Sequence, residues 1–142
     1  MALIHTIKLT EGEAVLKCYR TDSSGGSIDV NLESLLTRPN EVYDPLTCKA
    51  FIRGIYWGVK PNKHIDVTRI ISPTEVHGHY YFIGSGSYDY AGFVDNVYAE
   101  KDIRITGDGP FHVILVLTKT GWKNKIEEWQ FGSYDNPNLV GS

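Results

Sequence analysis

FHVILVLTK, from Phe111 to Lys119, is the stretch that decides the fold. In an extended strand alternate residues point to opposite sides, and both sides here are apolar because every residue from 113 to 117 is valine, leucine or isoleucine. The turn residues 107–110 precede the run and Gly121 follows it, so it is too short for a globular helix. The stretch is therefore predicted to be a central strand, covered on both faces.

Short alternating segments separated by turn residues lie on either side of this strand. We predict that 3–9 pairs with 14–20 as a hairpin, with Leu3, Ile7 and Leu9 giving the first strand one buried face. Three further antiparallel pairs are expected: 49–58 with 64–71, the two strands joined by Gly84–Ser87, and 102–106 with the central strand. Arg53 interrupts an otherwise apolar face, which indicates either that this strand runs past the edge of the core or that it carries a bulge at Gly54. A last strand is predicted at 126–131, and helix is expected only at 32–36, as one turn.

These elements predict an all-β protein, an antiparallel β-sandwich that is jelly-roll-like. A small β-barrel is the alternative, because the same number of strands can close on itself. Residues 1–132 are expected to form a single domain. Residues 133–142 have coil composition and are predicted to be a C-terminal tail that docks on a neighbouring molecule.

The composition narrows the classes of partner. The chain has 142 residues, a formal charge of −3, 42% hydrophobic and 22% charged residues. This charge offers no basic excess for a phosphate backbone, so no nucleic-acid partner is expected. The N-terminus has no secretion-signal pattern and no window is apolar enough for a membrane span, which predicts synthesis in a cytoplasm and no membrane partner. Cys18 and Cys48 are interpreted as reduced thiols in apolar strands, although a disulfide between them is possible.

The segment Glu75–Phe93 is the best candidate for a binding site. Its aromatic side chains are interpreted as a platform for sugar rings or a partner protein, with half of them serving as core residues in the alternative view. His77 and His79 project to one side of a strand at a spacing that metal sites use, but no third ligand follows, so neither a metal nor a cofactor is expected. The candidate binding residues, with one on the tail, are Tyr80, Tyr81, Tyr88, Tyr90, Phe93 and Tyr134.

No catalytic set is evident in the sequence. None of the five histidines stands beside a plausible nucleophile and a third, orienting residue. We therefore expect a protein without enzymatic activity.

Four stretches carry a resemblance to a known group of proteins: IKLTEGEAVLK, IYWGVKPNKHIDVTR, DIRITGDGPFHVILVLTKTGW and WQFGSYDNP. Together they resemble small β-rich virion structural proteins of tailed bacteriophages. The resemblance implies a capsid decoration or cement protein on the head, made in the host cytoplasm and located in the virion. Its implied partners are further copies of itself, as a homo-oligomer, and a major capsid or neck protein.

Two alternatives to the decoration role stay open. The same resemblance also fits a neck or tail accessory protein. The tyrosine-rich segment 75–93 instead fits a carbohydrate-binding β-sandwich module.

Overall fold

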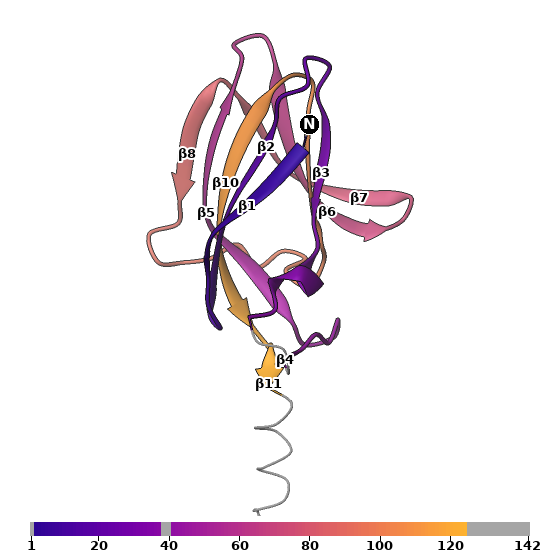
Figure 1. Cartoon of the computed structure of the whole chain (residues 1–142), viewed down its shortest axis with the longest axis vertical. Coiled ribbons are helices and arrows are strands. Elements are labelled where there is room, and N and C mark those ends of the chain that lie inside the picture. Colours follow the sequence, from indigo (N-terminus) through magenta and orange to yellow (C-terminus); the bar gives the residue numbers. More distant parts are fainter. Residues whose placement is uncertain (1, 38–40, 125–142) are drawn as a thin grey trace, which may run out of the picture.

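A computed structural model describes residues 2–37 and 41–124, which fold as an all-β sandwich of two antiparallel sheets (Figure 1). The first sheet has five strands in the order β1-β2-β10-β5-β8, and the second has four in the order β3-β9-β6-β7. The predicted sandwich is confirmed, and the barrel alternative is wrong because the strands form separate sheets. The five strands of the first sheet are β1 (Ala2–Leu9), β2 (Glu13–Arg20), β10 (Phe111–Thr120), β5 (Lys49–Val59) and β8 (Ser85–Asp89).

The second sheet and two small elements complete the described chain. The second sheet consists of β3 (Gly26–Val30), β9 (Ile103–Gly107), β6 (His64–Ser72) and β7 (Glu75–Ile83). A pair of two-residue strands, β4 (Glu41–Val42) and β11 (Lys123–Asn124), lies at one end of the sandwich. The single expected turn of helix is present as a 3-10 helix, η1 (Leu32–Leu35). The strand predicted at 126–131 and the tail at 133–142, with Tyr134, lie outside the described residues.

The pairing of eight strands is nested along the chain. β6 pairs with β7, β5 with β8, β3 with β9 and β2 with β10, as in one long hairpin whose closed end is the turn after β6. Rolling this hairpin places β10 beside β5 in one sheet and β9 beside β6 in the other. The sandwich is therefore built from contacts between segments distant in the sequence.

The central position predicted for Phe111–Lys119 is confirmed, because β10 is the middle strand of the five-stranded sheet, between β2 and β5. Val113, Leu115 and Leu117 are fully buried between the sheets. The other face is only half-covered, since Ile114 and Val116 are partly exposed. Apolar residues of both sheets close the core, among them Leu16, Ile28, Ile52, Ile55, Ile65, Val67, Ile103 and Ile105.

Three predicted hairpins are wrong, since their strands lie in different sheets. β5 and β6, β7 and β8, and β9 and β10 each connect across the sandwich. Gly84 alone separates β7 from β8, with a positive φ of 63°. A strand with one apolar face buries that face equally well whether the next strand pairs with it in a hairpin or crosses to the other sheet. The same turn residues serve both connections, so they do not distinguish the two.

The first hairpin, β1 with β2, is confirmed, but the predicted burial of β1 is wrong. Every residue from Ala2 to Lys8 is exposed. The physical reason is that β1 is the edge strand, where the second sheet no longer covers the first.

Of the two alternatives for Arg53, the bulge at Gly54 is confirmed. Val116 pairs with Gly54 and Leu117 with Ile52, so Arg53 is the extra residue. Its guanidinium forms an ion pair with the carboxylate of Glu13 on the outer side of the sheet.

Candidate functional site

The predicted aromatic residues do not form one platform. Tyr80 and Tyr90 are half-buried and hydrogen-bonded to each other through their hydroxyl groups. Tyr81 is 66% exposed on the opposite face of β7, where it stacks on His64 with ring centroids 5.1 Å apart. Phe93 is 78% exposed in the segment between β8 and β9. The candidate residues are thus divided between the inside of the sandwich and two separate surfaces.

Trp57 and Phe82 form the centre of an aromatic cluster that reaches the surface at Tyr88. Their rings are stacked, with centroids 3.8 Å apart and planes at 8°. Tyr88 leans on both, 5.8 Å from each ring centroid, and is 52% exposed. Gly86 lies beneath Trp57, since a Cβ there would be 2.7 Å from the indole ring. Trp57 and Phe82 were not predicted as site residues, although strand alternation places Trp57 on the same inner face as Ile55.

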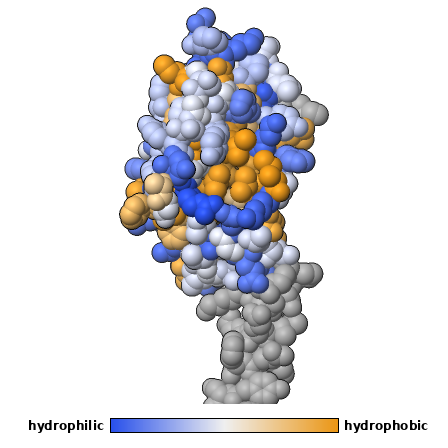
Figure 2. Space-filling view, turned by 90° about the vertical axis from the view of Figure 1, so that its left-hand side faces the viewer, coloured by the Kyte–Doolittle hydropathy of each residue, from blue (hydrophilic) through white to orange (hydrophobic). Residues whose placement is uncertain are grey.

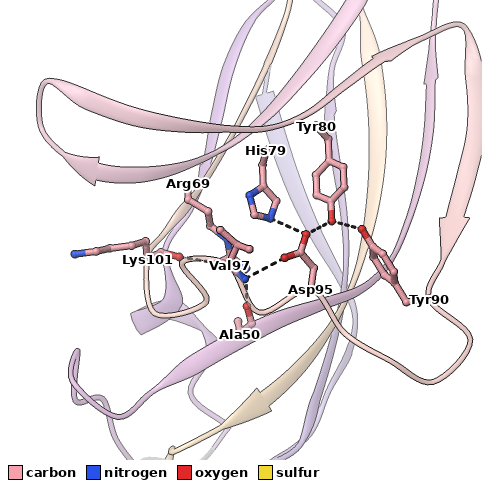
Figure 3. A network of polar contacts seen from close by, with 8 residues as sticks. All are labelled: Ala50, Arg69, His79, Tyr80, Tyr90, Asp95, Val97 and Lys101. Carbon is pink, nitrogen blue, oxygen red and sulfur yellow. Dashed lines mark hydrogen bonds and ion pairs between the residues drawn. The ribbon is translucent and has the colours of Figure 1, made fainter.

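A buried polar network lies next to this cluster and is centred on Asp95 (Figure 3). One carboxylate oxygen accepts a hydrogen bond from the hydroxyl of Tyr80 and lies 3.0 Å from Nε2 of His79. The other accepts from the backbone N–H of Val97 at 3.0 Å. Tyr80 and His79 come from β7, and Asp95 comes from the segment that leads to β9. The network therefore fastens this long segment to the second sheet.

Arg69 extends the network across the sandwich. Its side chain is fully buried, and its two terminal nitrogens donate to the carbonyl oxygens of Ala50 and Lys101, each at 2.7 Å (Figure 3). Ala50 belongs to β5 in the first sheet, whereas Arg69 belongs to β6 in the second. Arg69 thus joins the two sheets and the segment before β9.

The electrostatics of the network follow from this burial. Burial lowers the pKa of Arg69 to about 10, against the opposing charge of Asp95. Burial also lowers the pKa of His79, and it raises that of Tyr80 together with the hydrogen bond to Asp95. For Asp95, burial alone would raise the pKa, but the hydrogen bonds from Tyr80 and Val97 outweigh it and lower the pKa. A neutral His79 and an ionised Asp95 are the forms that these shifts favour near neutral pH.

The chemistry of this network is that of a structural clamp. The Asp95 carboxylate is occupied by donors from the protein, and the His79 side chain is only 4% exposed. Among residues 2–37 and 41–124, no group of three potential metal ligands is close enough to hold an ion, and His77 contacts the rings of His79 and Tyr98. The two cysteines, Cys18 and Cys48, are buried with free thiols in the core.

The outer faces of the two sheets both carry apolar side chains among polar ones. On the four-stranded sheet the outward side chains of β3 and β9 are polar: Ser27 bonds to Thr106 at 3.0 Å, and Arg104 forms a two-point contact with Asp29. On the same sheet β7 exposes Val76, Tyr81 and Ile83. On the five-stranded sheet charged side chains such as Lys17 and Glu13 also point outward. The strand register places six apolar or aromatic side chains on the same face: Leu3, Val15, Tyr19, Tyr56, Ile114 and Val116. We call this set the outer apolar face. Figure 2 shows an apolar patch with a hydrophilic rim on the side of the molecule where this sheet lies.

An open groove of about 770 Å³ adjoins the outer apolar face at the end where β2 and β5 finish. His112 and Tyr19 line it, and the imidazole of His112 lies over Gly58, where a Cβ would be 2.3 Å from the ring. Lys17, Arg20 and Lys60 also line the groove. This surface was not predicted as a site, although strand alternation already places His112 and Ile114 on one face of the central strand.

Comparison with known proteins adds no assignment: the chain matches no protein-family model, no curated protein and no solved structure. Within the described part of the chain, no helix is long and apolar enough to cross a membrane.

Proposed function

We propose that the protein is a non-enzymatic structural protein that attaches to a larger assembly through the outer apolar face. The single observation that carries this proposal is the patch of apolar side chains on the outer side of the five-stranded sheet, which has a hydrophilic rim (Figure 2). Exposed apolar patches with polar rims mark interaction surfaces in soluble proteins.

The resemblance to small virion proteins gives this assembly a specific form. On that basis the protein is a capsid decoration protein of a tailed phage, located in the virion and bound to a major capsid protein, with a neck or tail position as the alternative. The nested pairing of β2 with β10, β3 with β9, β5 with β8 and β6 with β7 supports a jelly-roll topology, in which a long hairpin is rolled into two sheets. Many copies on a symmetric shell strengthen contacts that are individually weak.

The attachment is tested with phage heads that lack the protein, prepared from the phage that encodes it. The variant Tyr56→Asp places a charge on the outer apolar face at a side chain that is 46% exposed, and a cooperative thermal melt checks that the variant is folded. We expect the wild type to cosediment with the heads and Tyr56→Asp to lose most of this binding. The matched control is Tyr81→Asp, at an exposed tyrosine outside the outer apolar face, and it should bind as the wild type does. Equal binding by all three proteins contradicts attachment through this face.

A carbohydrate-binding role is the second candidate, and the exposed ring of Tyr88 against Trp57 and Phe82 favours it. Aromatic rings of this kind stack on sugars. Glycan-array binding that disappears in Tyr88→Ala and in Tyr90→Ala selects this role. Tyr90 bonds to Tyr80 inside the sandwich, so loss of binding in Tyr88→Ala alone assigns the contact to the surface ring.

A further inference from the structure

The free edge of β1 differs from the rest of the five-stranded sheet. Within the described residues β1 pairs only with β2, which leaves its other side unpaired. Leu3, Ile4 and Ile7 are 40%, 42% and 54% exposed. A strand of this length with apolar side chains and unpaired backbone groups is a template for a further strand.

The exposure of Ile4 shows that the core is open at this edge. Ile4 pairs with Cys18, and Thr6 pairs with Leu16, so these residues point toward the space between the sheets. Cys18 and Leu16 are 0% and 2% exposed, but Ile4, one strand farther out, is 42% exposed. The core therefore ends beneath β2, and the inner side of β1 projects beyond it.

The other edges carry features that discourage strand addition. β8 and β3 have only five residues each, and β8 contains Gly86. β7 is longer, but its register shifts at two places along β6. In β1 the five residues Ala2–Thr6 pair regularly with β2, and the irregularity comes only after Thr6. This stretch contains no proline, no carboxylate and no lysine or arginine, so it lacks the usual protection of an edge strand.

We infer that Ala2–Thr6 pairs antiparallel with the same strand of a second copy, which joins the two five-stranded sheets into one continuous sheet. A second copy fits this edge because a strand is its own complement under a two-fold axis, and one contact then satisfies both free edges. The pairing brings the two open core ends together, so that each Ile4 covers the other. His5 is the only ionisable side chain in the stretch, so little like-charge repulsion opposes the contact.

This inference rests on the proposed function in one respect: it names a second copy of the chain as one partner of a protein that joins a larger assembly. The joined sheet also sets the two outer apolar faces side by side, since Leu3 belongs both to that face and to the pairing strand. A dimer thus offers a capsid lattice two attachment surfaces in one rigid unit.

The test is the oligomeric state of the full chain in solution, measured by sedimentation velocity over a range of concentrations. We expect a dimer for the wild type and a dissociation constant raised about 100-fold or more in Ile4→Lys, because two lysines then meet across the two-fold axis. The matched control is Ile83→Lys, at the exposed end of β7, which should dimerise as the wild type does. A monomeric wild type overturns the inference, as does dissociation by Ile83→Lys but not by Ile4→Lys.

Cysteine crosslinking provides a second measurement that does not depend on how Ile4→Lys folds. Leu3→Cys, Ile4→Cys and His5→Cys, made one at a time, place a thiol at successive positions of the pairing stretch. Cys48 is fully buried and does not compete, and Cys18, the cross-strand neighbour of Ile4, is replaced by alanine in all three variants so that it cannot form a disulfide with Ile4→Cys. A disulfide-linked dimer should form at the position nearest the two-fold axis, and absence of crosslinking at all three contradicts the pairing. A dimer that fails to bind phage heads refutes the virion role alone, and a monomer that binds them refutes the pairing alone.

Discussion

Replacing Asp95 by asparagine tests whether the buried network holds the sandwich together. Asparagine keeps the shape of the side chain but removes the charge that accepts from Tyr80 and Val97 and faces His79. A hydrogen bond to a charged group contributes about 1.5–3 kcal/mol and a neutral one about 1 kcal/mol, so weakening two such bonds costs roughly 1–4 kcal/mol. The Asp95 side chain is 18% exposed, which places the expected loss near the middle of this range, about 2–3 kcal/mol.

Urea unfolding followed by tryptophan fluorescence measures this loss directly, and the melting temperature should fall by roughly 10 °C. Asp89→Asn is the matched control. Asp89 precedes Asp95 in the same region and accepts one hydrogen bond at the exposed surface, from the backbone N–H of Ala91 at 2.8 Å. Its replacement should cost less than about 1 kcal/mol. If Asp95→Asn is no less stable than Asp89→Asn, the network is not a clamp.

Three further substitutions examine the core, the protonation of the network and one turn. Leu115→Asp should prevent cooperative folding, since it buries an unpaired carboxylate, whereas Ile114→Asp on the outer face should still give a cooperative thermal melt. Burial lowers the pKa of His79, so the neutral side chain gives its full contribution to stability above about pH 6.5, and this contribution is lost as the pH falls below that value. In His79→Gln the free energy of unfolding, measured with urea, should therefore vary less with pH below about 6.5. An unchanged slope contradicts this. Gly121→Ala should cost about 2 kcal/mol or more because its Cβ would meet the Thr47 carbonyl oxygen at 2.0 Å, whereas Gly92→Ala, with a similar φ but open space, should cost about 1 kcal/mol.

The sequence predicts the elements of this fold better than their connections. The central strand follows from its apolar residues on both faces, and the bulge follows from Arg53 beside Gly54. Which strands pair does not follow, because the turns after β5 and before β10 contain the same residue types that close hairpins, although here they join different sheets. The exposure of β1 depends on how far the opposite sheet extends, which the sequence of β1 does not contain.

The network shows both what strand alternation predicts and where it stops. Ile65 and Val67 face inward on β6, and the same strand alternation places Arg69 inside, where its burial requires hydrogen-bond partners. Lys119 is a parallel case at the end of the inner face of β10; it is buried and donates to the carbonyl oxygens of Thr10 and Leu35. Asp95 lies in an irregular segment, and no periodic pattern connects it with His79 or Tyr80. Its role depends on a fold that brings this segment against β7.

The copy number and position of the protein in purified virions test the central claim most directly. If the proposed virion role holds, cryo-electron microscopy of the particles should show the sandwich at symmetric positions on the head, with the outer apolar face of the five-stranded sheet against the capsid. Quantitative mass spectrometry of the same particles should give a copy number that matches this symmetry. If the protein is absent from purified particles, or is bound with the outer face of the four-stranded sheet against the capsid, the account is contradicted.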